Sequence, residues 1–318
     1  MTHAELQILA AMAIDLLLGD PRWVPHPVRL VGWAANRLEV PLRRVIPGER
    51  IAGTVLVILL TALTTAFAAL LLWLFASLHP FLGFVFGALF VYWSIAPRDL
   101  YDHVQEVFRA LSTGDLQLAR ERVGRIVGRD TGHLDESGIT RAAVESTAES
   151  IVDGITAPLF YAAIAGPLGA VAYRVINTLD STFGYHNERY ERFGWAAAKL
   201  DDLVNFVPAR LTAPVMCLAT LPLRLKTLNA FRIFWRDAQK HTSPNAGYAE
   251  AAMAGALGVQ LGGLNYYFGK PSEKPTIGDR NRELETADIQ RAIRLALTST
   301  GLFLLSCLAS RIVFQFAT

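Results

Sequence analysis

The chain has 318 residues, of which 30 are Lys or Arg and 28 are Asp or Glu, giving a net charge of +2 at pH 7. Hydrophobic residues make up 52% of the chain and charged residues only 18%, and the mean hydropathy is +0.31, which is more apolar than is typical of soluble domains. The balanced, scattered charge argues against a nucleic-acid-binding surface, and the composition indicates a membrane protein.

The N-terminal segment predicts a short membrane helix at about 4–19, followed by an arginine-rich cytoplasmic loop at 20–50. Three prolines and a glycine between positions 19 and 27 interrupt the helical pattern, because proline fixes φ and lacks an N–H. The loop should therefore be rigid and present Asp20, His26 and Arg29. A histidine beside two prolines is more often structural than catalytic, so both interpretations of His26 stay open.

Residues 51–97 contain no Asp, Glu, Lys or Arg. A membrane span needs about 20 apolar residues, so this run predicts two membrane helices, at about 51–77 and 81–97. Arginines flank both ends of the pair but not its turn. By the positive-inside rule, the flanks are cytoplasmic and the turn lies on the outer side. Residues 1–97 then form an N-terminal membrane region.

Residues 98–294 predict a mainly helical catalytic region. Its first part, 98–128, has the apolar spacing of two amphipathic helices. Proline and glycine interrupt the apolar segments near 154–173 and 203–223, which predicts membrane-embedded or re-entrant segments, since broken backbone at membrane depth is tolerated where it lines a protein cavity. A complete span by 154–173 is the alternative.

The C-terminal residues 295–318 predict a last membrane helix. The expected fold class is all-α: a polytopic helical membrane protein with a helical cytoplasmic portion and re-entrant or broken helices. Within 241–263, Ala254, Gly258 and Gly262 recur at four-residue spacing, which favours close helix packing along one face.

The main chemical signal is a row of ionisable residues on one predicted helix. Arg141, Glu145, Glu149 and Asp153 recur every four residues, and i,i+4 neighbours share a helix face. Like charges at this spacing repel, so a metal ion or arginines should face the three carboxylates. A solvated helix face is the alternative interpretation.

Familiar catalytic motifs are missing: the sequence has no phosphate-binding P-loop, no H-E-x-x-H and no G-x-S-x-G. Cys217 and Cys307 both lie in apolar runs, which is typical of buried packing residues. The remaining polar set consists of carboxylates, arginines and asparagines with no evident nucleophile. Such a set suits phosphates bound through Mg²⁺, with carboxylates on the metal and arginines on the phosphate oxygens.

Three stretches carry a specific resemblance: DLLLGDPRWVPHPVRLVGW (15–33), the long block 129–213 that includes RAAVESTAESIVDGITAPLF and VINTLDSTFGYHNERYERFGWAAAKLDDLVNF, and HTSPNAGYAEAAMAGALGVQLGG (241–263). Nearly the whole chain resembles the CbiB/CobD family, the integral-membrane cobalamin-biosynthesis proteins called adenosylcobinamide-phosphate synthases. Two positions depart from the family pattern: Ser150, where asparagine is usual, and Ala249, where proline is usual.

The resemblance implies a ligase that forms a carbon–nitrogen bond in cobalamin biosynthesis. It would join adenosylcobyric acid to (R)-1-amino-2-propanol O-phosphate, or to aminopropanol, with ATP as co-substrate and Mg²⁺. Transfer of the γ-phosphoryl group to the carboxylate would give an acyl phosphate, whose phosphate leaves readily. The expected partners are these substrates, the lipid bilayer and other late enzymes of the pathway, with no nucleic acid. The expected location is the inner membrane, with the active site facing the cytoplasm.

The site hypothesis assigns three groups of residues. The catalytic acids would be Glu145, Glu149, Asp153, Asp180 and Asp202, together with Asp201, and the first three would bind Mg²⁺. Phosphate would be neutralised by Arg129, Arg141, Arg189 and Arg210, while Asn177, Tyr185, Asn187 and Asn205 would orient substrate. Asp20, His26 and Arg29 would close the site from the first loop, and Ser243 and Asn245 from the other side. Each of these could instead be a structural ion pair or cap.

Two other functions fit parts of the pattern. A non-catalytic membrane sensor of the ampicillin-resistance regulator type would be related in sequence, but would not need so dense a set of Asp, Glu, Asn and Arg residues. A corrinoid transporter would use broken helices along a substrate path, but the sequence has no repeated halves and few charges within its apolar segments.

Overall fold

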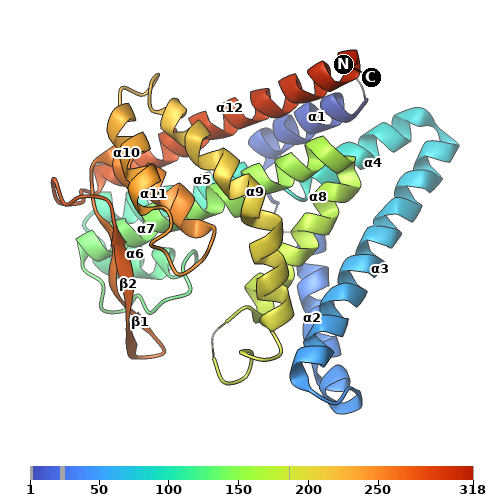
Figure 1. Cartoon of the computed structure of the whole chain (residues 1–318), viewed down its shortest axis with the longest axis horizontal. Helices are drawn as coiled ribbons and strands as arrows, with labels where there is room; N and C mark the ends of the chain where they lie inside the picture. Colours follow the sequence, from blue (N-terminus) through green and yellow to red (C-terminus); the bar gives the residue numbers. More distant parts are fainter. Residues whose placement is uncertain (1–2, 22–25, 186, 318) are drawn as a thin grey trace. The chain divides into compact units, whose positions relative to one another are not determined.

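A computed structural model describes residues 3–21, 26–185 and 187–317, with side chains up to residue 313. The chain is 74% helical, which confirms the all-α prediction (Figure 1). The elements are α1 (His3–Leu18), α2 (Pro27–Val45), α3 (Glu49–Leu78), α4 (Pro80–Tyr92), α5 (Pro97–Ser112), α6 (Leu116–Val123), α7 (Glu136–Ile151), the π-helix η1 (Val152–Thr156), α8 (Ala157–Phe183), α9 (Trp195–Ala219), α10 (Thr227–Asp237), α11 (Ala246–Leu257), β1 (Leu261–Tyr267), β2 (Lys270–Ile277) and α12 (Ala287–Ala317).

The described chain contains four helical runs that are long and apolar enough to cross a membrane: Glu49–Leu78, Pro80–Ser112, Glu136–Phe183 and Ala287–Val313. The first, α3, is the most apolar, and only 22% of its 18-residue apolar stretch is buried within the protein. Its exposed side chains include Ile58, Phe67 and Trp73, a surface suited to lipid. These runs support the polytopic membrane assignment. Helix α1 has 16 residues and is not among them, so the predicted crossing at 4–19 stays a prediction.

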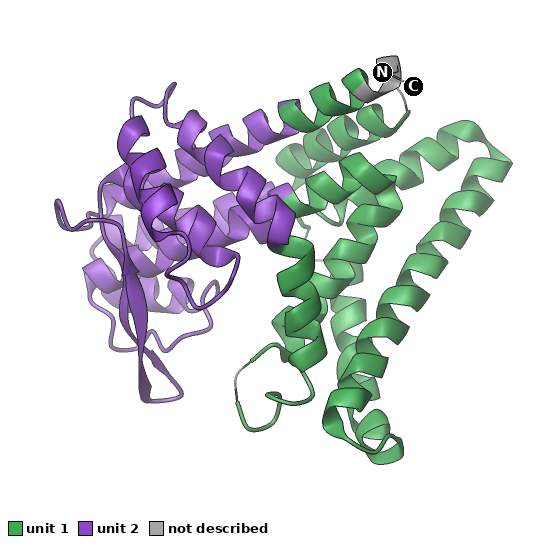
Figure 2. Ribbon diagram, viewed as in Figure 1, with its two compact units in different colours: residues 1–96, 157–205, 306–318 green, residues 97–156, 206–305 purple. Residues whose placement is uncertain are grey.

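The chain divides into two compact units, coloured separately in Figure 2: unit 1 comprises 1–96, 157–205 and 306–318, and unit 2 comprises 97–156 and 206–305. Residues 98–294, expected to form the catalytic region, fall in both units, because residues 157–205 belong to unit 1. The division of the chain into functional regions stays a prediction.

Unit 1 has a core built by α2, α3 and α8, in which Leu56, Leu179 and Phe183 are buried. The turn before α9 joins this core, since a Cβ atom on Gly53 would lie only 1.8 Å from the carbonyl oxygen of Phe193. That close approach explains a glycine near the start of α3. The predicted loop 20–50 is wrong in part, because Pro27–Val45 forms the helix α2; residues 22–25 of that loop lie outside the described residues.

Unit 2 has a second core formed by α5, α6, α7 and the first turns of α12. Helix α7 starts where the Asp135 carboxylate accepts the N–H of Gly138 at 2.7 Å, a capping interaction that satisfies one of the free donors of the first turn. Helices α10 and α11 pack on each other, and an antiparallel hairpin, β1–β2, follows them.

The predicted interruptions of the apolar segment 154–173 are real features of the backbone. The π-helix Val152–Thr156 ends just before Pro158, which lacks the N–H that a continuous helix would use. Helix α8 then kinks at Gly166, where φ is +66° and Pro167 follows. Glycine is the residue that adopts this conformation without steric cost. Whether this segment spans or re-enters the membrane stays a prediction.

The C-terminal part of unit 2 differs from the prediction in two ways. Helix α11 ends at Leu257 with Gly258 in a left-handed conformation, and Gly262 lies in β1, so Ala254, Gly258 and Gly262 do not form one helix-packing face. Residues 261–277 form the β-hairpin, with a register shift between Leu261 and Gly263.

Candidate functional site

A buried polar cluster of unit 2 joins α7 to the β-hairpin. An Arg129 Nη2 group lies 2.5 Å from Glu145 Oε2, and both side chains are over nine-tenths buried. Arg129 also donates to the side-chain oxygen of Asn265. Glu145 accepts the N–H of Gly262 at 2.7 Å. Two of the predicted site residues, Arg129 and Glu145, therefore form a buried ion pair that is fully used in holding strand β1.

Arg141 reinforces the same junction from one turn earlier on α7. Its guanidinium donates to the carbonyl oxygens of Gly262 and Leu264, the latter at 2.8 Å, and to Asn265 Oδ1 at 3.2 Å. The backbone of the strand can offer these groups because Gly262 and Gly263 have φ of +83° and +84°. Consecutive positive φ values at a register shift turn the peptide groups out of the ladder, so the two glycines turn this strand toward α7.

The described side chains do not bring the predicted carboxylate row together as a three-ligand metal site. No group of three His, Cys, Asp or Glu side chains in the described chain could hold a metal ion. Glu145 is occupied by Arg129 and the Gly262 N–H, and Asp153 lies in the π-helix, where the α-helical spacing of the row ends. Of the carboxylates in this row that lie on α7, Glu149 is the exposed one, and its side chain makes no hydrogen bond or ion pair with any described residue.

Three residues near this cluster were missed by the sequence analysis. Glu250, on α11, is only 4% exposed, and its carboxyl pKa is raised well above the ordinary value by burial and by the charges of Glu145 and Glu149. His241 Nε2 lies 3.6 Å from Glu250 Oε1. Burial would lower the pKa of Lys274, on β2, but the surrounding acidic groups raise it above its ordinary value.

A sequence signal for Glu250 does exist. It is the single charged residue in the alanine- and glycine-rich run 246–258, where a carboxyl group has no obvious role in packing. His241 and Lys274 carry no comparable signal, because both lie in polar segments where histidine and lysine are unremarkable.

In unit 1, the structure brings together another part of the predicted set. The Asp201 carboxylate accepts hydrogen bonds from the amide of Asn177 at 3.3 Å and from that of Asn205 at 2.9 Å. Asn205 in turn accepts from the Tyr173 hydroxyl at 2.9 Å. Asn177 and Asn205 are buried, so this network is a fixed connection between α8 and α9 that could orient a bound polar group.

Two more predicted acids, Asp180 and Asp202, lie on the same two helices, α8 and α9. Asp202 forms an ion pair with Lys199 at 3.2 Å, one turn away on α9. Asp180 is half-buried near the end of α8, where a side chain on Gly184 would collide with its carboxylate.

The predicted residues of the two loops in unit 1 mostly have structural partners. His26 Nδ1 accepts the N–H of Val28 and so caps α2, while its Nε2 lies 3.7 Å from Asp20. The structural interpretation of His26 is therefore sufficient. Arg29 is exposed, and no hydrogen bond or ion pair joins its side chain to the rest of the described chain.

The loop between α8 and α9 is also stabilised by side chains that were predicted to bind substrate. Arg189 binds the buried carboxylate of Glu39 at 2.9 Å, and this hydrogen bond and charge raise the pKa of Arg189. The side chain of Asn187 accepts the N–H of Tyr190 at 3.0 Å, and Tyr185 is exposed. Arg189 and Asn187 thus stabilise the loop, while the exposed Tyr185 can contact a ligand.

Arg210, Ser243 and Asn245 come together in unit 2 at the start of α11. The Arg210 guanidinium lies 3.4 Å from the ring centre of Phe206 and 4.4 Å from that of Tyr248, and it donates to Asn245 Oδ1 at 3.3 Å. The Ser243 hydroxyl accepts the N–H of Asn245 at 3.2 Å. An arginine held between two rings is fixed in orientation, so these residues position the turn that carries His241.

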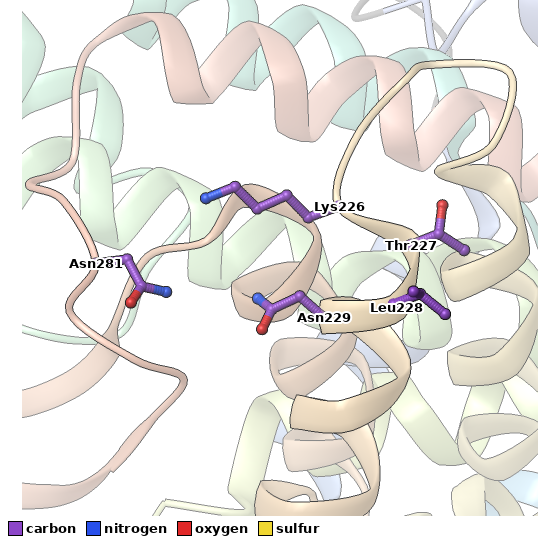
Figure 3. A pocket seen from close by; sticks show the side chains of 5 residues that line it. All are labelled: Lys226, Thr227, Leu228, Asn229 and Asn281. Atoms are coloured by element: carbon purple, nitrogen blue, oxygen red, sulfur yellow. The ribbon is translucent and has the colours of Figure 1, made fainter.

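A cavity of about 510 Å³ lies elsewhere in unit 2, at the start of α10. It is lined by Lys226, Thr227, Leu228, Asn229 and Asn281. Figure 3 shows the ammonium group of Lys226 and the amides of Asn229 and Asn281 around one opening. None of the predicted site residues lines this cavity.

Comparison with known proteins identifies the family. The CobD/Cbib protein family matches residues 8–296. A "Cobalamin biosynthesis protein CobD" of Geobacter metallireducens is 47% identical over 295 residues, covering 93% of each chain. "Cobalamin biosynthesis protein CbiB" of Salmonella typhimurium is 41% identical over 304 residues, covering 95% of each chain.

A third relative, from Leptospira interrogans and also called "Cobalamin biosynthesis protein CobD", is 46% identical over 293 residues, covering 92% of this chain and 93% of its own. No solved structure matches this chain. The family match covers most of the sequence, and the identities are well above the level at which relationship is in doubt. The chain therefore belongs to the CobD/CbiB family of cobalamin biosynthesis proteins.

Proposed function

We propose that this protein catalyses ATP-dependent amide formation in cobalamin biosynthesis, joining the carboxylate of adenosylcobyric acid to the amine of (R)-1-amino-2-propanol O-phosphate or of aminopropanol. The product would be adenosylcobinamide phosphate in the first case. A carboxylate resists attack by an amine because it has no good leaving group. Phosphorylation by ATP gives an acyl phosphate, whose phosphate group leaves when the amine attacks.

The polar groups of unit 2 support this proposal. The observation that carries it is Glu149, exposed and without an ion pair in the described chain, one turn beyond the buried Arg129–Glu145 pair. A carboxylate held on a rigid helix beside a fixed cluster can receive a cationic group with little reorganisation. Both cysteines are buried, which favours a mechanism of positioning and charge neutralisation over thiol catalysis.

Mg²⁺ enters this proposal with the ATP phosphates, because the carboxylate row does not fit a resident metal site. Mg²⁺ is commonly bound through substrate phosphates and only one or two carboxylates. The inner membrane as the location, a cytoplasmic active site and contact with other late enzymes of the pathway are parts of the same proposal.

The test is Glu149→Gln in detergent-purified protein, with Glu273→Gln, another exposed glutamate of unit 2, as the control. We expect Glu149→Gln to lower the rate of cobinamide phosphate formation by about tenfold or more with the unfolding midpoint unchanged. The control should keep the wild-type rate. A wild-type rate for Glu149→Gln would remove this residue from the site, and no amide product from the wild-type protein with ATP and Mg²⁺ would refute the function itself.

A further inference from the structure

Polar groups that the fold does not satisfy gather beside the Arg129–Glu145 pair. The side chains of Glu149 and Lys274 form no hydrogen bond or ion pair with any described residue. Glu250 has only the His241 ring within ion-pair distance among the described side chains, at 3.6 Å. Buried polar groups are normally hydrogen-bonded, so groups without partners in one place suggest a ligand.

His241 is the clearest of these groups. Its side chain is 7% exposed, and no described atom forms a hydrogen bond with its buried Nε2. The other ring nitrogen, Nδ1, accepts the backbone N–H of Ser243 at 2.9 Å, so in the neutral ring the proton is on Nε2. Burial, and then the charge of Lys274, lower the pKa of His241 to about 4. At neutral pH, His241 therefore presents an N–H donor toward Glu250.

The charged groups around Glu250 come from two elements and the loop before α7. Helix α7 contributes Glu145 and Glu149, the loop contributes Arg129, and strand β2 contributes Lys274, each within electrostatic reach of Glu250. Arg129 and Glu145 neutralise each other as an ion pair. The remaining set of two carboxyl groups and one ammonium can bind a molecule that carries both a positive and a negative charge.

The position of Lys274 fits this arrangement. In the hairpin register, Lys274 lies opposite Gly263, which has no side chain to cover it. Its neighbours Glu273 and Pro275 are exposed, whereas Lys274 is half-buried, as expected when successive strand residues point to opposite faces. Lys274 therefore faces the glutamates of α7 and α11.

We propose that Glu149, Glu250 and Lys274 form the subsite for the amine substrate, in which the two glutamates bind its ammonium group and Lys274 binds its phosphate. This inference rests on the proposed function. The ligand class is a small phosphorylated amine, whose two charges are separated by two carbon atoms and an oxygen. Such a molecule places one charge on each side of the cluster, and Lys274 is the residue that distinguishes it from the unphosphorylated amine.

The experiment measures binding by isothermal titration calorimetry to the full chain in detergent. The three probes are 1-amino-2-propanol O-phosphate, 1-amino-2-propanol without phosphate, and propan-2-yl phosphate without an amine. The variants are Lys274→Gln, Glu250→Gln and Glu149→Gln. The matched controls are Lys270→Gln and Glu273→Gln, which change exposed residues of the same strand.

We expect Lys274→Gln to weaken binding of the phosphorylated amine by about 10- to 100-fold, the usual effect of losing a charged hydrogen bond, while leaving 1-amino-2-propanol unaffected. Glu250→Gln and Glu149→Gln should remove the preference for the phosphorylated amine over propan-2-yl phosphate. The two controls should bind all three probes as the wild type does. Since Glu149 is exposed, its variant gives a result even if Glu250→Gln fails to fold.

Several results would overturn the subsite. One is equal weakening of both amines by Lys274→Gln; another is the same effect from Lys270→Gln. If the wild type forms amide but the three variants bind every probe normally, the subsite is wrong and the proposed function stands. If the predicted binding pattern is found but no amide forms with ATP, Mg²⁺ and adenosylcobyric acid, the subsite stands and the function is wrong.

Discussion

Glu145→Gln tests whether the buried ion pair holds the β-hairpin on α7. The Arg129 and Glu145 side chains are 5% and 9% exposed and 2.5 Å apart, and the same carboxylate accepts the Gly262 N–H. Removing one charge of a buried pair costs about 3–5 kcal/mol, because the other charge stays buried without compensation. Glutamine keeps one acceptor oxygen for the Gly262 N–H but turns an amide N–H group toward Arg129, so we expect a cost of at least about 3 kcal/mol.

The assay is thermal unfolding of the detergent-purified protein at one scan rate. In a unit of about 150–250 residues, each kcal/mol moves the midpoint by about 2–4 °C, so Glu145→Gln should lower it by at least about 6–12 °C. Glu149→Gln, one turn later on the same helix, is the matched control and should change the stability by no more than about 0.5 kcal/mol.

The double variant Arg129→Met/Glu145→Gln separates charge from packing. With no buried charge left, it should be more stable than Glu145→Gln alone. The reasoning is refuted if Glu145→Gln and Glu149→Gln shift the unfolding midpoint equally. It is also refuted if the double variant unfolds at a clearly lower temperature than Glu145→Gln alone.

Three further predictions concern the parts that position the two polar clusters. Gly262→Ala should destabilise unit 2 by at least about 1–3 kcal/mol in thermal unfolding, because φ is +83° and the added Cβ would lie 2.3 Å from a carbonyl oxygen; Gly269→Ala, with φ of +75° and open space around it, should cost less. Asn205→Leu should cost about 1–3 kcal/mol by the same measurement, since it removes the hydrogen bonds that Asn205 makes with Asp201 and with the Tyr173 hydroxyl. Neighbouring cations and a backbone N–H hold the pKa of Asp237 below its ordinary value despite its burial, so stability should fall as pH drops below about 4, and Asp237→Asn should flatten that part of an unfolding-against-pH curve.

The membrane helices could be predicted from sequence because their signal is local. A long run without charge, such as 51–97, needs no partner to be recognised, and α3 and α4 occupy most of it. The kink at Gly166 is local for the same reason, since glycine followed by proline interrupts a helix wherever it occurs. Helix α2 was missed because the prolines around 21–27 were taken to indicate a loop that continues to residue 50. Pro27 is in fact the first residue of a helix, a position where the missing N–H breaks no helical hydrogen bond.

The β-hairpin could not be predicted from the pattern used. Strand β2 contains Pro271 and Pro275, which argue against a central strand, but a two-stranded sheet consists only of edges, where proline is tolerated. The spacing of Gly258 and Gly262 suggested helix packing, whereas Gly258 caps α11 in a left-handed conformation and Gly262 forms the bulge that receives Arg141. Helical periodicity and the glycines of a turn can look alike in one sequence.

The roles of the arginines were also beyond the sequence, because an ion pair depends on contacts far apart in the chain. Arg189 binds Glu39 across 150 positions, and Arg129 reaches Asn265 across 136. Both were predicted to bind phosphate, and both have protein partners. The sequence indicated that arginines should lie near the carboxylates, but only the fold shows which arginine pairs with which acid.

These pairings suggest a division of labour within the acidic row of α7. Glu145 and Arg141 hold a strand whose two glycines offer backbone groups, and each hydrogen bond they make reduces the freedom of that strand. Glu149 lies on the same rigid helix and is not needed for the junction. A row of like carboxylates is costly in an isolated helix, and here one of them is compensated by Arg129, so the cost that remains falls on Glu149 and on its neighbour Glu250. A bound cation would remove that repulsion. We therefore expect a cationic ligand that binds at Glu149 and Glu250 to raise the free energy of unfolding of this protein.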